Sequence, residues 1–154
     1  MKLKKLFGES YLNTDSDFDI LKNVVLKLSG IRNDFIFLHI NSFGQSFESI
    51  HLKYEDYYNN LAEDIDTLLE IIAMNSEKVL IDLNKNPYKS DKSKWLNSED
   101  DLIYTGINLI EELLKELENA RKSVSENEAL VSDIDSIASY WSKERSYFLK
   151  RFVL

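Results

Sequence analysis

Residues 46–73, SFESIHLKYEDYYNNLAEDIDTLLEIIA, decide the fold class of this chain. Their apolar positions recur at steps of three and four residues, which is the period of one face of an α-helix. The positions are Phe47, Ile50, Tyr54, Tyr58, Leu61, Ile65, Leu68 and Ile72. A stripe of this length predicts a long amphipathic helix that packs its apolar face against other helices.

Three more helical patterns lie on either side of this stretch. The first begins in the polar cluster 14–17 and is expected to end at Gly44, and its stripe is Phe18, Leu21, Val25, Leu28, Phe35 and Leu38. Another opens at Ser98, an N-cap residue type, with the stripe Ile103, Ile107, Ile110, Leu114 and Leu117. The last follows a capping-box pattern from Ser125 to Glu128, with the stripe Leu130, Ile134, Ile137, Trp141, Phe148 and Phe152.

Residues 75–97 form a longer connection with loop residues around Pro87. A short helix is expected within it at Val79, Leu80, Ile81 and Leu83. No segment alternates apolar and polar residues as a strand does. Four amphipathic helices and one long connection predict an all-α four-helix bundle with a long crossover connection. A chain of 154 residues fits one domain, 1–154, with 1–13 as an N-terminal tail.

Composition excludes several functional classes. The chain has no cysteine, which excludes disulfides and thiolate metal sites. It has no apolar run of about 18 residues that would span a membrane, and no signal-peptide pattern at its start, so we expect a cytoplasmic protein without a membrane partner. The net charge of −8 argues against nucleic acid as a partner.

Both histidines of the chain lie close to carboxylates, in the set His39, His51, Glu55, Asp66 and Glu70. Imidazole and carboxylate are ligands for iron, zinc or manganese. On a helix, the last four positions fall within an arc of about 100°, but Glu55 and Asp66 lie about 16 Å apart. One helix therefore cannot close one site with both ends. Two antiparallel copies related by a two-fold axis could, with two equivalent sites per dimer.

The segment 39–51, HINSFGQSFESIH, resembles the signature of Dps-type mini-ferritins, in which His-Trp-Asn leads through Gly and Phe to a second His. The matching positions are His39, Asn41, Gly44, Phe47, His51, Glu55, Leu61, Ala62, Glu63, Ile65, Asp66 and Glu70. The helix order also fits over residues 14–154. The resemblance implies a ferritin-like four-helix bundle. Ile40 stands where the family has Trp, and Glu55 where Asp is usual.

The same resemblance implies a shell of twelve subunits with ferroxidase sites at two-fold interfaces. His39, His51 and Glu55 would come from one subunit, and Asp66 and Glu70 from its mate. The implied reaction is oxidation of Fe(II) by hydrogen peroxide or dioxygen, followed by ferric mineral storage that protects against oxidative damage. Zinc or manganese is the alternative metal in the resting site. Asp133 is the candidate for an acidic pore at three-fold axes.

Three other functions compete with this interpretation. Ile40 keeps open a ferritin-like helical assembly protein without ferroxidase activity. A DNA-condensing protein is disfavoured by the charge and by a basic tail of only Lys2, Lys4 and Lys5. An intrachain di-iron oxidase would need two Glu-x-x-His motifs, and Glu48 with His51 supplies one.

Overall fold

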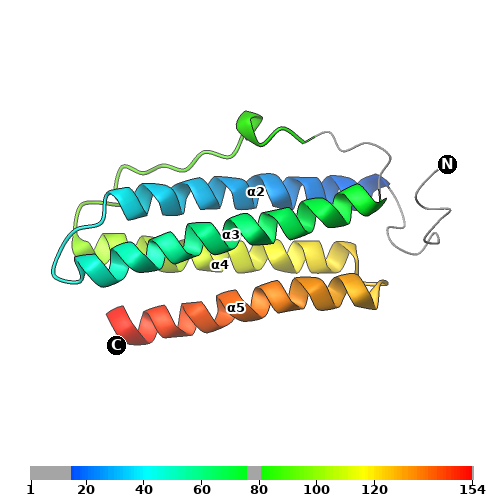
Figure 1. Ribbon diagram of the computed structural model, residues 1–154. Coiled ribbons are helices and arrows are strands. Elements are labelled where there is room, and N and C mark those ends of the chain that lie inside the picture. The colour runs from blue at the N-terminus through cyan, green and yellow to red at the C-terminus, as the bar shows by residue number, and fades with distance from the viewer. Residues whose placement is uncertain (1–14, 76–80, 154) are drawn as a thin grey trace.

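The computed structural model describes residues 15–75 and 81–153, and within them the chain is helical (Figure 1). The long helices are α2 (Asp15–Ile40), α3 (Phe47–Asn75), α4 (Glu99–Ser123) and α5 (Glu128–Phe152). A short 3₁₀ helix, η1, covers Leu83–Lys85. No strand occurs in the described residues, so the all-α prediction is confirmed for them. The arrangement is compatible with the predicted four-helix bundle.

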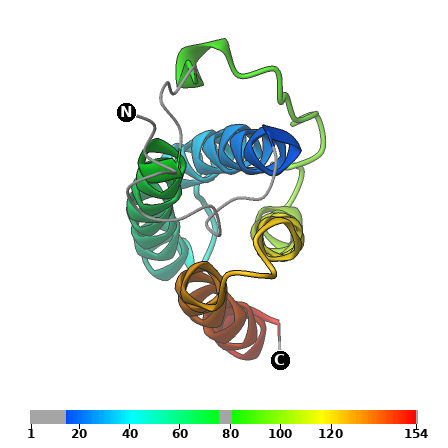
Figure 2. The same cartoon turned by 90° about the vertical axis from the view of Figure 1, so that its right-hand side faces the viewer.

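The four long helices surround one core, as the view along their axes shows (Figure 2). In Figure 1, α2 and α5 run in one direction, whereas α3 and α4 run in the other. Helix α2 packs against both α3 and α4, and α4 packs against α5. None of the described helices is both long enough and apolar enough to cross a membrane.

The apolar stripes predicted from the sequence supply most of the core, because each helix turns its apolar face inward. Aromatic rings join α2, α3 and α5 at its centre. Phe35 stacks on Trp141 with ring centroids 6.1 Å apart, and Tyr57 lies 5.4 Å from Trp141. The predicted stripe of α3 is wrong at Phe47, which remains 45% exposed at the first residue of the helix. The stripe also omitted Tyr57, which is fully buried, whereas the predicted Tyr58 is partly buried and packs against the core.

Polar residues set the helix ends. Ser98 caps α4 as predicted, because its hydroxyl accepts the Asp101 backbone N–H at 3.0 Å. The predicted start of α5 at Ser125 is wrong, since Asn127 is the N-cap and accepts the Leu130 N–H at 3.2 Å. Residues 124–127 instead form the turn that closes α4. The Asn127 N–H donates to the Val124 carbonyl at 2.9 Å.

The described part of the connection, residues 81–98, follows α2 along its length (Figure 1). Asn86 donates to the Leu26 carbonyl, and Ser90 donates to the buried Asp34 carboxylate at 2.6 Å. Lys92 forms an ion pair with the same carboxylate at 3.2 Å. The only helix in these residues is η1, so the short helix is confined to three residues. Val79, Leu80 and the tail 1–13 lie outside the described residues.

Candidate metal centre

The two histidines lie on either side of the loop 41–46, which joins α2 to α3. The last turn of α2 is closed by side chains rather than by the predicted Gly44. Asn41 Nδ2 donates to the Phe37 carbonyl at 2.8 Å, and Ser42 Oγ donates to the Leu38 carbonyl at 2.7 Å. The helix therefore ends at Ile40, and the chain reverses within six residues. This tight reversal brings the last turn of α2 beside the first turns of α3.

His39 and His51 contact each other directly at this reversal. Their rings are stacked, with centroids 3.8 Å apart and planes inclined by 21°. His39 Nδ1 lies 2.9 Å from the His51 backbone carbonyl, and His51 Nδ1 lies 2.9 Å from the His39 carbonyl. A carbonyl oxygen can only accept, so each Nδ1 carries the proton that it donates. The two residues therefore hold one another through a reciprocal pair of hydrogen bonds.

This pairing sets the tautomer of both rings. In a neutral imidazole with Nδ1 protonated, Nε2 carries the lone pair that binds a metal. No described residue forms a hydrogen bond with either Nε2. A metal-ligating histidine usually donates its other ring N–H to a carbonyl or carboxylate, which fixes the direction of the ligand nitrogen. Both half-buried imidazoles have such a hydrogen bond, from Nδ1 to a backbone carbonyl.

Two further aromatic rings enclose the histidine pair. Phe47 lies nearly parallel to His51, with centroids 5.2 Å apart, and continues the stack. Tyr58 meets His39 edge-on at 5.3 Å. Sequence periodicity placed Phe47 and Tyr58 in the core stripe of α3. Tyr58 packs against the core and also contacts His39, whereas Phe47 is exposed and stacks on His51. Each of these rings packs against one of the two imidazoles and limits the rotamers open to it.

The three predicted carboxylates lie along α3 but do not gather at the histidines. Glu55 follows His51 by one turn and is half-buried, whereas Asp66 and Glu70 are exposed. At about 1.5 Å per residue, Asp66 lies roughly 16 Å beyond Glu55 along the axis. Among the side chains that the structure describes, in 19–75 and 81–153, no three from His, Cys, Asp or Glu are placed to hold a metal ion. The chain thus brings His39 and His51 together, whereas Asp66 and Glu70 lie far from them along α3.

The charge of α3 is strongly negative. The helix carries seven acidic residues and one lysine, Lys53. This lysine turns toward α5, where it pairs with Glu144 at 3.1 Å. Glu55, Asp66 and Glu70 form no ion pair with a described cation. A row of uncompensated carboxylates produces a negative potential that raises the local concentration of cations.

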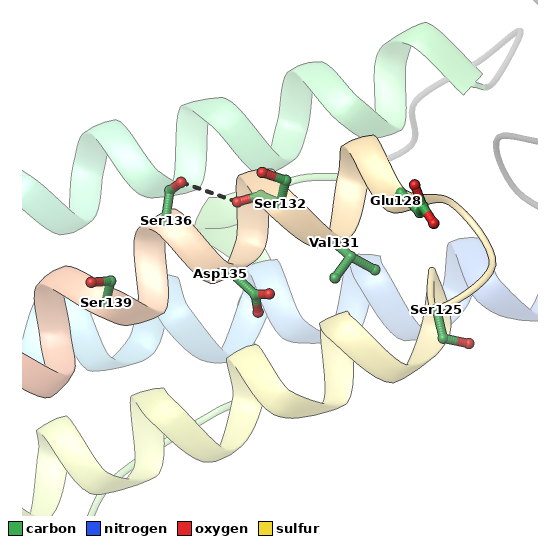
Figure 3. A pocket seen from close by; sticks show the side chains of 7 residues that line it. All are labelled: Ser125, Glu128, Val131, Ser132, Asp135, Ser136 and Ser139. Atoms are coloured by element: carbon green, nitrogen blue, oxygen red, sulfur yellow. Dashed lines mark hydrogen bonds between the residues drawn. The ribbon is translucent and has the colours of Figure 1, made fainter.

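Asp133, the candidate for a pore, is exposed on the second turn of α5. A nearby open groove of about 480 Å³ runs along α5, but Asp133 does not line it (Figure 3). The groove is lined by Ser125, Glu128, Val131, Ser132, Asp135, Ser136 and Ser139. Asp135 pairs with Arg121 of α4 at 2.8 Å. The groove is thus rich in serine, and the ion pair neutralises one of its two acids.

Sequence reasoning missed three residues of this region: Phe47 and Tyr58 as ring contacts of the histidines, and Glu99 as a contact of the loop 41–46. Glu99 begins α4 and accepts the backbone N–H groups of Gln45 and Ser46. The first-turn position of Glu99 suggested only a favourable charge at the helix N-terminus. Its actual contact joins segments more than fifty residues apart, and no local pattern signals such a contact.

Comparison with known proteins does not identify a family for this chain. No protein-family model matches the sequence. No curated protein matches it. The function is therefore inferred from the residues and the geometry described above.

Proposed function

We propose that this protein is a ferritin-like ferroxidase and iron store. It oxidises Fe(II) at sites shared between two copies of the chain and retains the ferric product. The observation that carries the proposal is the reciprocal hydrogen bonding of His39 and His51, which leaves Nε2 of both rings available as a ligand. The Dps-type register of the surrounding residues adds to it.

The division of the five predicted ligands supports a shared site. His39, His51 and Glu55 lie at one end of α3, and Asp66 and Glu70 lie toward its other end. A second α3, placed antiparallel across a two-fold axis, would bring its Asp66 and Glu70 to the histidine end of the first. Each dimer would then hold two equivalent sites.

The donor set suits iron as the substrate. Imidazole nitrogen binds Fe(II) well, and the harder carboxylate oxygens favour the Fe(III) product. Hydrogen peroxide accepts two electrons, so two Fe(II) ions oxidised together reduce it to water or hydroxide without releasing a hydroxyl radical. Dioxygen is the alternative oxidant. Zinc or manganese would fit the same ligands. A competition experiment that measures whether each of these metals displaces iron from the protein distinguishes the three.

Exposed apolar side chains around the histidines support contact with a second copy. Ile40 is 71% exposed, Leu52 51%, Phe47 45% and Phe43 37%. Large exposed apolar patches are typical of protein interfaces. The helix directions and the path of residues 81–98 along α2 favour a ferritin-like crossover. The step from dimer to a shell of twelve chains follows from the family resemblance.

Subunit mixing tests the shared site. The variants His51→Ala and Asp66→Ala are prepared separately. Each is expected to lose Fe(II) oxidation, which is measured as the growth of ferric absorbance after peroxide is added. A dimer of one H51A and one D66A chain keeps one intact site, so random mixing should restore about one quarter of the sites. Glu48→Ala, an exposed acid one turn before His51, is the matched control and should keep full activity. Full activity in either single variant would refute the assignment.

A helical assembly protein without ferroxidase activity is the alternative. It is favoured by the lack of a three-ligand group within the described part of one chain. Light scattering together with the iron assay separates the two functions. Large particles that never oxidise Fe(II) would support the alternative, whereas particles that accumulate ferric product would support the proposal.

A further inference from the structure

The loop between the two histidines is held by a residue of α4. Glu99, the first residue of that helix, accepts the Ser46 backbone N–H at 3.1 Å and the Gln45 N–H at 3.3 Å, one with each carboxylate oxygen. These amides directly precede Phe47, the first residue of α3, where N–H groups lack partners within the helix. Glu99 therefore caps α3 from a neighbouring helix, and the contact links the loop 41–46 to the start of α4.

Gly44 provides the space for this contact. Its backbone has φ of +99°, in the left-handed region that favours glycine. A Cβ at this position would lie 2.5 Å from Cδ and Oε2 of Glu99 and 2.9 Å from its Cγ. Any side chain would therefore displace the carboxylate. The turn of the loop and the docking of Glu99 depend on the same residue.

The histidine pair depends on the position of this loop. Each Nδ1 hydrogen bond ends on a backbone carbonyl of the opposite helix, so both bonds form only while the end of α2 and the start of α3 keep their separation. The loop also holds both helix ends through its backbone. The Ser42 N–H donates to the His39 carbonyl at 3.4 Å, and the Phe47 N–H donates to the Gly44 carbonyl at 3.2 Å. Glu99 supplies a side-chain link from the loop to α4.

We infer that Glu99 is a positioning residue for the metal centre. Its carboxylate fixes the loop 41–46 against α4 and thereby keeps His39 and His51 in the reciprocal pair, in which Nδ1 of each ring is bonded and Nε2 is free to bind a metal. The metal-binding part of this inference rests on the proposed function. The positioning of the histidines does not, because it concerns contacts within one chain.

Loss of the carboxylate has a defined consequence. Without it, the Gln45 and Ser46 amides turn to water, and the start of α3 is free to move relative to α2. The Nδ1–carbonyl bonds then open, and the imidazoles sample rotamers and tautomers in which Nε2 is no longer held as the unprotonated ligand nitrogen. Outer-sphere hydrogen bonds that orient metal ligands typically change affinity by about 10- to 100-fold. Glu99 acts through the loop, so the lower figure, about tenfold, is expected.

Cobalt(II) binding to the full-length protein measures the effect, because its visible spectrum reports ligand geometry. Glu99→Ala should weaken cobalt binding about tenfold and change the visible bands. Glu99→Gln retains one acceptor oxygen and should restore part of the affinity. Asp100→Ala removes the neighbouring exposed acid of the same helix turn and should leave affinity and spectrum unchanged. Cobalt binding by E99A that equals wild type would overturn the role at the metal centre.

Acylation by diethyl pyrocarbonate provides a second readout that needs no metal. The reagent attacks unprotonated imidazole nitrogen, and the chain has 2 histidines, so both can be followed by absorbance. Glu99→Ala should react faster than wild type, because opening of the pair separates the two stacked, half-buried rings and gives the reagent easier access to Nε2 of each. Asp100→Ala should react at the wild-type rate. Equal rates for E99A and wild type, with the helical circular dichroism of both intact, would refute the positioning itself.

The two readouts separate this inference from the proposed function. If wild type binds no cobalt and oxidises no iron, the ferroxidase proposal fails, and the acylation rates still decide whether Glu99 positions the histidines. If wild type binds metal and E99A matches it in affinity and acylation rate, the inference fails while the ferroxidase proposal stands.

Discussion

Replacing Asp64 with asparagine should stabilise the folded protein at neutral pH. Asp64 lies half-buried on α3, and its Oδ2 accepts the indole N–H of the buried Trp141 at 2.7 Å and the Asn60 amide at 3.2 Å. Burial raises the pKa of Asp64 from its usual 3.8 to about 6, and the nearby charge of Glu63 adds to this effect. The two hydrogen bonds lower the pKa but do not compensate for burial.

The sign of the pH dependence follows from this raised pKa. The folded state holds the proton more tightly than the unfolded state, so the stabilising effect of the protonated group is complete below about pH 4 and is lost as the pH rises through about 6. A difference of about two pKa units sets a ceiling of about 3 kcal/mol. Asp64 is partly exposed, and solvent screens its charge, so we expect about 1 kcal/mol. Asparagine keeps an acceptor for Trp141 and removes the buried charge.

Urea unfolding followed by tryptophan fluorescence tests this expectation at fixed protein concentration. Asp64→Asn should raise the free energy of unfolding by about 1 kcal/mol at neutral pH, with the difference shrinking toward pH 4. Asp64→Leu removes the acceptor, strands the Trp141 N–H and should cost about 1–3 kcal/mol. Glu118→Gln, an exposed acid of α4, is the control without this pH dependence. A D64N variant that is less stable than wild type at neutral pH, or a gain in stability that does not depend on pH, would refute the reasoning.

Three more predictions concern packing, iron uptake and DNA. Gly106→Ala should destabilise the protein by about 1–3 kcal/mol in urea unfolding, because its Cβ would lie within 2.9 Å of the buried Tyr54 ring. On the proposed function, Asp133→Asn should slow iron uptake, measured by stopped-flow absorbance, without changing the particle size in light scattering; an unchanged uptake rate would refute the proposed pore role of Asp133. The assembled protein should not retard duplex DNA in a gel at about 150 mM salt, because phosphate binding needs several cationic contacts; retention would contradict this interpretation of its charge.

The helices and much of the core could be predicted because helical periodicity is a local property of the chain. Leu21, Val25 and Leu28 recur with the helix period and are fully buried in α2. Ser98 caps α4 through an amide three residues away, so its role is also local. The spacing of His51 and Glu55 likewise placed both residues on one side of α3.

Packing between helices decided the remaining features. Tyr57 and Tyr58 are neighbours in sequence, and periodicity cannot fix the rotation of α3 that turns Tyr57 toward Glu144 of α5 and Tyr58 toward His39. Helix α5 begins later than predicted, with Asn127 as its N-cap, because residues 124–127 form the turn that closes α4.

The arrangement of His39 and His51 also depends partly on local sequence and partly on packing between helices. Sequence supplied the residue types and their spacing, which sufficed to propose His39 and His51 as candidate ligands. The reciprocal Nδ1–carbonyl bonds and the hold of Glu99 on the loop arise only when α2, α3 and α4 pack together. Such contacts join atoms that are distant along the chain. Their geometry is therefore set by the relative positions of whole helices, which no local pattern of residues encodes.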